Sequence, residues 1–452
     1  MREIITLHIG QAGCQMAPYL WDLYYADNMI NPNGEKSSRK VKEEEFLEGT
    51  VFFHETENKY VPRSLLIDYD PKIKSSLNNN QFLDLFPKDH LIIGSASSSN
   101  NFSRGHYHSD NNLVGAIKDQ IRKLTEKCDS VQGFQIFHSI NGGTGSGLAS
   151  MLLYDSNVFG KKNWNTFSII PSETFSTTTV EPYNSTLALY FLDKFSDLSF
   201  VFDNQKLFKI CNDQLYVENP NYDTINQIIA RAAHSITCPY QSNSSLNPTK
   251  TMEELKKSLA INQKKYPLIS FSPLSNINPE KEIEKEIEKE KENEKEKEKE
   301  KEKGKDISDL TNSLFEMKNY LKSCSLKNEK ISKMNLYYRG NISEKEMNTS
   351  LELIKSMKNL NFASDFETFK SGLITNSIPN ISSDIFDPFD KCITMASNST
   401  SLKSTFENIA TNFDTLYRKR AYVHWYVGEG LEEGQFSEAR EVLEQIIHGF
   451  EN

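Results

Sequence analysis

The chain has 452 residues, of which 25% are charged and 37% hydrophobic, and its formal net charge is −10. This length leaves room for two to four domains and a sizeable core. The acidic balance argues against a nucleic-acid partner, and no apolar run reaches the ~18 residues that a membrane helix needs. The first residues lack the layout of a secretion signal, and the six cysteines show no CxxC spacing. We expect a soluble intracellular protein with reduced cysteines.

The amino half alternates runs typical of strands with runs typical of helices. Strands are predicted at Glu3–Ile9, Ser64–Ile67 and Phe134–Ile140. Helices are predicted at Pro18–Ala26, Leu113–Lys127 and Leu148–Tyr154, with a glycine-bearing loop over Gly10–Met16. The repeated order of strand, loop and helix predicts an α/β fold with a doubly wound parallel sheet. Ligands of such sheets lie at the carboxyl ends of the strands.

The carboxyl half begins with an apolar helix that we expect to be central, at Asn226–Thr237. Later strands are predicted at Leu268–Phe271 and Lys333–Tyr338, and later helices at Ser404–Tyr417 and Glu429–Phe450. The patterns predict three domains. They are a Rossmann-like α/β domain over residues 1–205, an intermediate α+β domain over 206–375 and a helical region over 376–452; the family resemblance described below implies that the first of them binds a nucleotide.

One segment of the intermediate domain, residues 280–306, is almost pure Lys and Glu. Like charges recur four residues apart, as at Lys281 and Lys285, and such pairs oppose a helix. Burial of its two isoleucines cannot offset the entropy of ordering the segment. We predict a solvated, mostly disordered insertion, with an interaction tail as the alternative.

A glycine-rich run, Asn-Gly-Gly-Thr-Gly-Ser-Gly at 141–147, lies between a predicted strand and a predicted helix. Glycines let backbone N–H groups approach an anion, and the start of a helix favours negative charge. The run has no Lys-Ser/Thr of a P-loop and does not match GxGxxG. Its position favours a phosphate site over a flexible turn, and the weaker loop Gly10–Gly13 would share that site.

Two carboxylates, Asp68 and Asp70, stand at the end of another predicted strand. A carboxylate at this edge could hold Mg²⁺ through water. A turn or N-cap role fits these residues equally well.

Several longer runs are distinctive. They are MREIITLHIGQAGCQ at 1–15, Val61–Arg63, Arg104–Tyr107, Phe137–Gly147, Ser176–Thr177, Glu181–Asn184, Asp203–Asn204, Lys419–Gly430 and Phe436–Arg440. With these runs the chain resembles the tubulin family, and the last two resemble its alpha class more than its beta class. The resemblance is strong over residues 1–240 and 400–440 and weak between them. It implies a divergent alpha-type protein of the cytoplasm and cytoskeleton that binds GTP, pairs with beta-tubulin and builds microtubules.

The resemblance also implies the residues of a GTP site. Those implied to hold the phosphates are Ser139, Gly142, Gly143, Thr144, Gly145 and Ser146. Those implied around the nucleoside are Gln11 and Gln15 on the pocket wall, Thr177 and Glu181 near the ribose, Asn204 and Asn226 on the guanine edge, and Tyr222 stacked on the base. Amide side chains suit guanine because they offer a donor and an acceptor. Asp70 would be the ligand of Mg²⁺.

GTP hydrolysis in this family is arranged between subunits, according to the resemblance. An acidic residue on the exposed face of an alpha chain positions a water at the nucleotide of the next subunit. Glu254 is the best match, and Glu253 is one position away because the preceding loop differs in length. A plain exposed helix carboxylate is the alternative. The chain's own GTP would be covered by its partner and turned over slowly or not at all.

The sequence departs from the family pattern at several positions. Asn141 replaces a glycine; asparagine is the non-glycine residue that best tolerates a positive φ, so we expect the loop to keep its shape at modest strain. Asp70 replaces a glutamate, and Ser97 replaces an acidic residue near the terminal phosphate. The Lys/Glu segment replaces a loop of lateral contacts, and the sequence ends without an acidic tail. Two other functions therefore stay open: a capping or regulatory protein that binds GTP, and a relative that has lost its nucleotide.

Overall fold

The computed structural model describes most of the chain. It covers residues 2–31, 33–35, 49–57, 59–77, 86–107, 111–172, 178–242, 249–261, 264–274, 307–323, 330–357, 361–362, 370–374, 378–379, 385–386 and 389–450. Thr177 and the predicted insertion at 280–306 lie outside the described residues.

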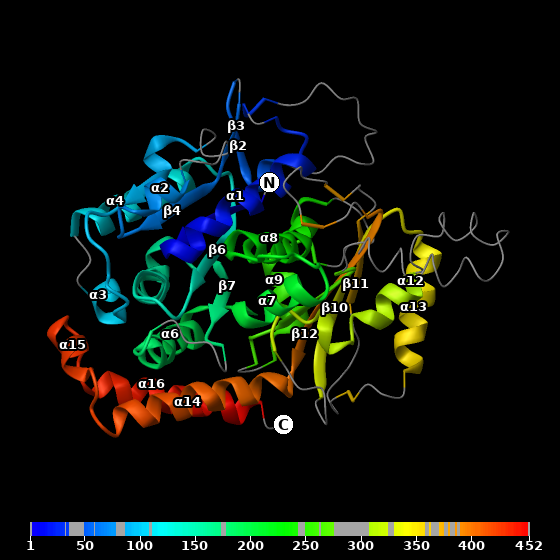
Figure 1. The fold of residues 1–452 in the computed structure, drawn as a ribbon. Coiled ribbons are helices and arrows are strands. Elements are labelled where there is room, and N and C mark those ends of the chain that lie inside the picture. Colours follow the sequence, from blue (N-terminus) through cyan, green and yellow to red (C-terminus); the bar gives the residue numbers. More distant parts are fainter. Residues whose placement is uncertain are drawn as a thin grey trace.

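A six-stranded sheet forms the centre of the amino-terminal half (Figure 1). Its strands are β1 (Glu3–Ile9), β4 (Ser64–Asp68), β5 (Leu91–Ile93), β6 (Val131–Ser139), β7 (Asn163–Ile170) and β8 (Leu198–Asp203). Their order is β5-β4-β1-β6-β7-β8, and every neighbouring pair is parallel, with Leu7 of β1 in register with Leu65 and Ile136. Nearly all residues of these strands are buried, as expected for a parallel sheet that is covered by helices on both faces. The predicted doubly wound parallel sheet is confirmed.

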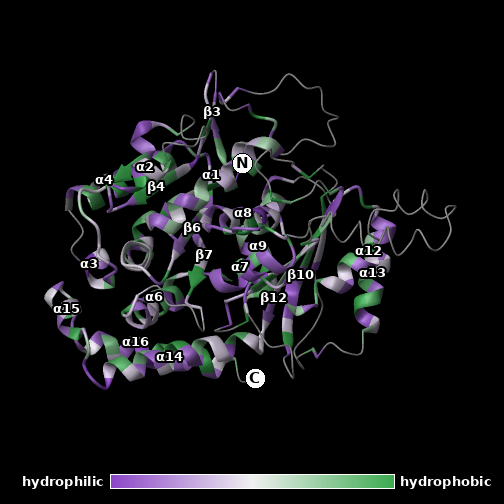
Figure 2. Ribbon diagram, in the orientation of Figure 1, coloured by the Kyte–Doolittle hydropathy of each residue, from purple (hydrophilic) through white to green (hydrophobic). Residues whose placement is uncertain are grey.

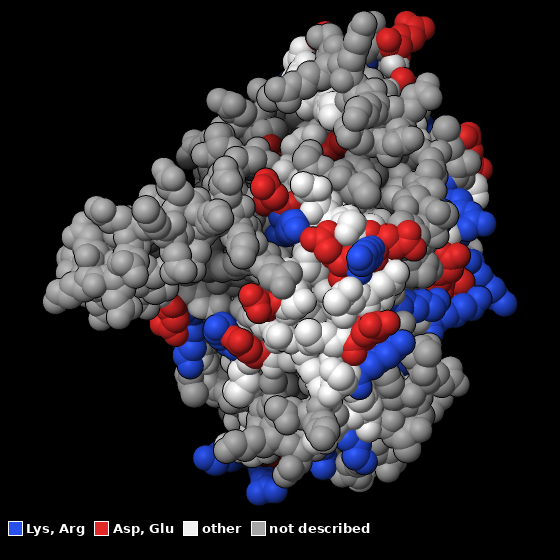
Figure 3. Space-filling model, turned by 90° about the vertical axis from the view of Figure 1, so that its right-hand side faces the viewer, with Lys and Arg blue, Asp and Glu red and all other residues white. Residues whose placement is uncertain are grey.

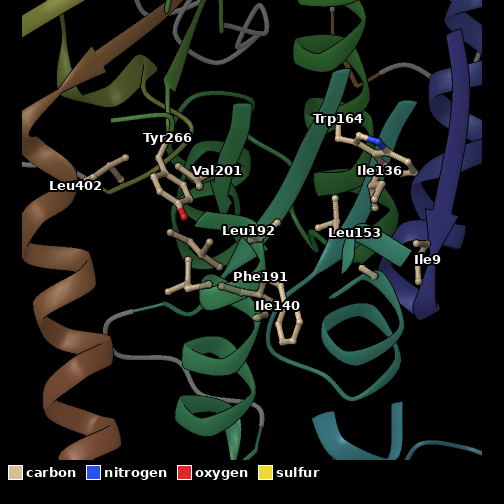
Figure 4. Packing of buried hydrophobic residues seen from close by; sticks show 14 of the residues in the cluster. Ile9, Ile136, Ile140, Leu153, Trp164, Phe191, Leu192, Val201, Tyr266 and Leu402 are labelled. Carbon is tan, nitrogen blue, oxygen red and sulfur yellow. The ribbon is translucent and has the colours of Figure 1, made fainter. Parts of the chain in front are cut away.

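Helices connect these strands and cover the sheet. They are α1 (Gly10–Asp27), α2 (Ile73–Leu77), α3 (Phe102–His106), α4 (Asn111–Glu126), α5 (Ala149–Tyr154), α6 (Glu181–Phe195) and α7 (Asn204–Asp213). A short hairpin of β2 (Phe53–Glu55) and β3 (Tyr60–Pro62) lies beside them. Figure 4 shows the core between sheet and helices, where Ile136 and Trp164 from the sheet and Phe191 from α6 are buried. This burial is the main stabilising term of the fold.

A second, mixed sheet forms the other half of the molecule. Its strands are β9 (Leu268–Ser272), β10 (Ile331–Gly340), β11 (Lys370–Ile374) and β12 (Lys391–Ser399), in the order β11-β10-β12-β9. Its helices are α9 (Met252–Leu259), α12 (Ile307–Ser313) and α13 (Glu344–Ser356). The helix α8 (Tyr222–Thr237) packs against α1 on one side and β12 on the other (Figure 1). The expected central helix therefore joins the two halves.

Three carboxyl-terminal helices complete the fold: α14 (Lys403–Tyr417), α15 (Val423–Gly428) and α16 (Gly434–Gly449). Polar and apolar residues alternate along α14 and α16 (Figure 2). Buried residues such as Phe406, Phe413 and Leu443 recur at helical spacing, and both helices pack on α6. These helices therefore pack on the amino-terminal half through α6.

One detail of the sequence prediction is wrong. Gly10–Met16 is not a loop, because α1 begins directly after β1: Gly10 makes the turn with a φ of 74°. A Cβ on Gly13 would lie 2.2 Å from the carbonyl oxygen of Phe137, so the glycine allows the helix to touch β6. The sequence did not predict the strand β12, whose last residues include the polar but buried Ser397 and Asn398.

The outer surface mixes charges of both signs. Figure 3 shows Lys and Arg interspersed with Asp and Glu over the described part of the face that carries α12 and α13. The ammonium of Lys391 lies 3.0 Å from the Glu346 carboxylate of α13. Among the described residues, no helix is long and apolar enough to cross a lipid bilayer.

Candidate nucleotide site

The first turn of α1 and the glycine-rich run meet where β1 and β6 end. A Cβ on Gly10 would lie 2.9 Å from the backbone nitrogen of Gly145, and a Cβ on Gly145 would lie 2.6 Å from the carbonyl oxygen of Ser139. The first turn of α1 and the glycine-rich run are therefore in direct backbone contact. The structure brings the two predicted phosphate loops together, and only glycine fits at these approaches.

The glycine-rich run forms one turn of π-helix, η5 (Thr144–Leu148), which continues into α5. The Ser146 hydroxyl donates to the carbonyl oxygens of Gly142 and of Gly143, the latter at 3.3 Å. Single π turns are found most often at functional sites. The hydroxyl of Ser146 therefore fixes the loop from inside, while Gly142 stays open, with only Asn100 within 4 Å of an added Cβ.

A buried amide that the sequence prediction missed, Asn184 on α6, supports this loop from behind. Its Nδ2 donates to the carbonyl oxygens of Asn100 at 2.7 Å and Asn141 at 2.9 Å. Its Oδ1 accepts from the Phe102 backbone at 3.0 Å and from the Tyr426 hydroxyl at 2.7 Å. The family run 181–184 contains this residue, but its contacts cannot be read from the sequence.

The expected positive φ at Asn141 is wrong. The left-handed conformations near the loop are those of Ser99 and Asn100, with φ values of 52° and 54°. Asn141 instead donates its backbone N–H to the Ser139 hydroxyl at 3.2 Å, and its Oδ1 is buried with no hydrogen-bond partner. Strain that we expected in the glycine-rich loop lies in the facing loop after β5.

The loop after β5 packs against the glycine-rich run. We call these two segments and the first turn of α1 the predicted phosphate cradle. The hydroxyls of Ser98 and Thr144 lie 2.9 Å apart, and a Cβ on Gly143 would lie 2.5 Å from the Ser98 oxygen. The structure thus joins the end of β5 to the glycine-rich run. Sequence spacing gave no signal for Ser98, because the contact depends on how the two loops pack.

The carboxylates after β4 lie beside this cradle. Burial raises the pKa of Asp68 to about 6. Hydrogen bonds from the Asp70 backbone and the Thr144 hydroxyl oppose this shift but are weaker than the effect of burial. Asp70 is half-buried, and its carboxylate accepts the backbone N–H of Lys72 at 2.9 Å, as in an Asx turn. Ser97 supplies a hydroxyl where the family carries an acid. Among the described residues, no group of three acidic, His or Cys side chains is arranged to hold a metal.

The residues predicted to surround the nucleoside lie where α1, α7 and α8 meet. Tyr222 and Asn226 lie one turn apart on α8, and the Tyr222 ring meets Phe208 of α7 edge-on at 5.8 Å. Asn204 is the first residue of α7, and its buried Oδ1 has no hydrogen-bond partner among the described residues. An unpaired buried amide oxygen is suited to a ligand, because burial without a partner costs free energy.

The remaining predicted residues border the same region. Gln11 is exposed and Gln15 is half-buried on the first turns of α1. Tyr19, one turn beyond Gln15, hydrogen-bonds to Asp223 beside Tyr222, which brings α1 to α8. Glu181 is the buried first residue of α6. The structure therefore brings the described members of the predicted set to one edge of the sheet.

Asp203 caps α7 and holds this end of the site rigid. Its Oδ1 accepts from the Ser172 hydroxyl at 2.5 Å and the Gln205 backbone at 3.0 Å, and its Oδ2 lies 3.1 Å from the Lys322 ammonium. Burial raises the pKa of Asp203, but Lys322 and Ser172 hold it below its ordinary value. Asp203 therefore stays ionised and fixes the start of α7, where Asn204 lies.

The acidic residues predicted for hydrolysis lie on the first turn of α9. Glu254 and Thr251 form a capping box: Glu254 Oε2 accepts the Thr251 N–H at 3.0 Å, and Thr251 Oγ1 accepts the Glu254 N–H at 3.2 Å. Glu253 lies 3.3 Å from Lys257 on the surface. Thr-Met-Glu-Glu at 251–254 is a visible capping signal, so this structural role could have been predicted.

The phosphate cradle and α9 lie at opposite ends of β6. The backbone N–H of Met252 donates to Gln132 near the start of β6 at 3.0 Å, whereas Ser139 ends the strand. Seven residues of extended strand separate these points by about 20–25 Å. Glu254 therefore cannot reach the cradle of its own chain.

This arrangement suits a nucleotide, because it combines backbone loops at several strand ends with hydroxyl groups and two amide oxygens that have no partner among the described residues. The phosphates would lie at the glycine-rich turn and the base beside α8. The fold and the site define a nucleotide-binding α/β protein with a second, mixed-sheet half. A family model described as the GTPase domain of the Tubulin/FtsZ family matches residues 3–212, and a Tubulin C-terminal domain model matches residues 293–411.

Curated relatives match along the whole chain. The tubulin alpha-6 chain of Naegleria pringsheimi is 36% identical over 98% of this chain and 94% of its own length. The tubulin alpha-2 chain of Caenorhabditis elegans is 34% identical over 100% and 96%, and the tubulin alpha-1 chain of Saccharomyces cerevisiae is 34% identical over 98% and 95%. The chain belongs to the tubulin family, as a divergent relative of its alpha chains.

Membership of this family confirms the broad function expected from the sequence. The protein is a cytoskeletal, GTP-binding structural constituent of microtubules with a GTPase domain, and it works within tubulin dimers.

Proposed function

We propose that this chain takes the alpha position in a cytoplasmic dimer with beta-tubulin and supplies Glu254 to hydrolysis of GTP on a neighbouring subunit. The observation that carries the proposal is the placement of α9 and the phosphate cradle at opposite ends of β6. In a row of subunits stacked along this direction, the acidic end of one chain meets the nucleotide end of the next. An acid that cannot serve its own site can then serve its neighbour's.

The proposed GTP site uses the residues that the family resemblance implies, of which Thr177 lies outside the described residues. Ser139 and Gly142–Ser146 hold the phosphates, Thr177 and Glu181 flank the ribose, and Gln11 and Gln15 line the wall. Asn204, Asn226 and Tyr222 recognise guanine. The unpaired Oδ1 of Asn204 supports this assignment, since guanine offers N–H donors. The division at residues 205 and 375 into three domains is part of the same proposal.

Asp70 is our candidate for Mg²⁺, through water. Its carboxylate already accepts one backbone N–H, so a second oxygen is left for a water of the ion's shell. Bound Mg²⁺ would neutralise charge on the terminal phosphates. Asp70 therefore fits one contact with Mg²⁺ through a bridging water.

In the composite site, water attacks the γ-phosphorus of the neighbour's GTP while the bond to the bridging oxygen breaks, which yields GDP and phosphate. Glu254 orients this water and accepts a hydrogen bond from it. The capping box engages Oε2 of Glu254, so Oε1 remains for the water. The helix start thus fixes the direction of the catalytic carboxylate.

The test compares two variants that each remove a capping-box glutamate. Glu254→Ala should lower GTP turnover in polymers with beta-tubulin by about 10²–10⁴-fold, the typical loss for a positioned acid or base. Glu346→Ala removes the equivalent residue of the capping box with Ser343 on α13, and turnover should not change. Phosphate release measured in assembled polymer decides between the outcomes.

Unchanged turnover in Glu254→Ala would overturn the catalytic assignment, and a loss in Glu253→Ala alone would move it by one residue. The nucleotide and partner are tested separately, by chromatography and mass spectrometry of protein purified from its native cell. Guanine nucleotide and a beta-tubulin are expected. Protein that carries neither would contradict the proposed dimer and its site.

A further inference from the structure

A short segment after α12, residues 318–323, runs along the edge of the second sheet. The backbone N–H of Leu321 donates to the carbonyl oxygen of Ile269 in β9 at 3.0 Å. Tyr320 forms an antiparallel bridge with Ser270 of the same strand. Because β9 is the outermost strand of its sheet, we call residues 318–323 the edge segment.

The edge segment also contacts α7 at both of its ends. Where α7 ends, Gln214 Nε2 donates to the carbonyl oxygen of Lys318 at 2.7 Å. Where it begins, the backbone N–H of Asp203 donates to the carbonyl oxygen of Leu321 at 3.3 Å, and the Lys322 ammonium lies 3.1 Å from Asp203 Oδ2. The helix that begins the proposed guanine site is therefore attached to the second sheet.

The ion pair between Lys322 and Asp203 is completely buried, with exposed side-chain fractions of 0% and 1%. The same carboxylate accepts from two neutral donors of its own half, the Ser172 hydroxyl and the Gln205 backbone N–H. A buried ion pair adds little net free energy of folding, because desolvation of both charges offsets their attraction. What it does is hold its two groups in one arrangement.

This arrangement bears on Asn204, which follows Asp203 directly and begins α7. Asn204 Oδ1 has no hydrogen-bond partner among the described residues. An amide that reads a base has to be held to within about 0.5 Å of its productive position. The matching GTPase-domain model ends at residue 212, so Lys322 lies outside the part of the chain that this model covers.

We propose that Lys322 is a positioning residue for guanine recognition: through Asp203 it sets the direction of the Asn204 amide. This inference rests on the proposed GTP site. Guanine carries a 2-amino group that can donate to Asn204 Oδ1, whereas hypoxanthine, the base of ITP, lacks that group. Lys322 therefore contributes to the choice of GTP over ITP without touching either nucleotide, and the second sheet takes part in nucleotide selection.

The test measures which nucleotide the full chain takes up when its dimer is assembled in an equimolar mixture of GTP and ITP. Bound nucleotide is extracted and counted by chromatography, and the partner's own site contributes equally in every variant. Lys322→Met should lower the ratio of GTP to ITP bound by this chain about tenfold, the effect of one lost hydrogen bond. The affinity for ITP should change little.

The matched control is the same substitution in the same segment. Lys318 is 61% exposed and lies 2.6 Å from the Glu316 carboxylate on the surface. Its side chain does not take part in the contact with α7, which uses its carbonyl oxygen. Lys318→Met should therefore bind GTP and ITP in the wild-type ratio.

A double variant keeps the proposal testable if Lys322→Met does not fold. Asp203→Asn with Lys322→Met removes both buried charges, and the new amide can still accept the Gln205 N–H at the start of the helix. The free energy of unfolding should return close to the wild-type value. The ratio of GTP to ITP should stay low, because the side-chain link to the edge segment is absent.

An unchanged ratio of GTP to ITP in Lys322→Met would overturn the positioning role, and so would a ratio that recovers together with stability in the double variant. Either result would make the ion pair a purely structural contact. A wild-type protein that binds no guanine nucleotide, or that takes GTP and ITP equally, would instead refute the proposed GTP site or the assignment of Asn204, which is a different outcome.

Discussion

Asn184 illustrates how much of the site depends on a residue that touches no ligand. It is fully buried and makes four hydrogen bonds, which connect α6 to both loops of the cradle and to Tyr426 of α15. Each loop therefore depends on the same amide. Its position explains why the glycine-rich run can stay open at Gly142 without collapsing.

Replacing this amide should loosen the cradle. Asn184→Ala leaves two carbonyl oxygens and a backbone N–H buried without partners, at about 1–3 kcal/mol for each unsatisfied group. We expect GTP affinity to fall about 10–100-fold and the free energy of unfolding to fall with it. Nucleotide retention and denaturant unfolding check both, with Asn341→Ala on the exposed turn after β10 as control. Wild-type retention in Asn184→Ala would contradict a supporting role.

At the scale of elements, neutral histidines tie the two central strands to their loops. His8 of β1 accepts from the Trp21 indole at 3.1 Å and lies 3.0 Å from the Gly13 carbonyl. His138 of β6 lies 2.7 Å from the Gly145 carbonyl and 2.8 Å from the Ser168 hydroxyl. Burial lowers the pKa of His8 to about 3 and that of His138 to about 4, although the backbone contacts raise them.

These histidines predict instability in mild acid. Their folded pKa values lie below the unfolded value of about 6.5, so protonation favours the unfolded chain, and stability that is present at pH 7 is lost as the pH falls. The two groups together should cost about 4 kcal/mol at pH 5. Urea unfolding at both pH values measures this loss. His138→Asn should remove about half of the loss that these two histidines cause, and the exposed His424→Gln is the control substitution.

The elements of the first sheet could be predicted because their periodicity and glycines are local signals. The strand β12 could not, since Ser397 and Asn398 look like loop residues and are buried only because Asn398 bonds to the carbonyl oxygens of Leu259 and Lys264. At the site, family motifs located most of the cradle residues. Ser98, Asn184 and Lys322 depend on contacts between distant segments, which no single motif encodes.

At the scale of the whole molecule, a buried ionic group joins the two halves. Asp27 ends α1, His234 lies on α8 and Arg339 lies on β10 of the second sheet. Asp27 Oδ2 lies 2.7 Å from His234 and Oδ1 lies 2.5 Å from Arg339, and all three side chains are buried. Although burial raises the pKa of Asp27, Arg339 and His234 lower it to about 2.

We expect this group to make the two sheets unfold together. Arg339→Met removes the permanent cation beside the buried Asp27 carboxylate and leaves it with the His234 contact, which should cost about 3–5 kcal/mol. The double variant Asp27→Leu with Arg339→Met removes both charges and should recover most of that loss. Denaturant unfolding, followed by separate probes in the two halves, should show coincident transitions in the wild type and separated ones in Arg339→Met.

The matched control is an ion pair of the same chemistry on the surface. Arg122→Met breaks the exposed contact with Asp119 on α4 and should cost at most about 1 kcal/mol. If only Arg339→Met has a large cost, the buried position of its ion pair, and not the presence of an ion pair as such, couples the two halves. A cost below about 1 kcal/mol for Arg339→Met, or transitions that stay coincident, would mean that packing between α1, α8 and β12 alone holds the nucleotide half to the second sheet.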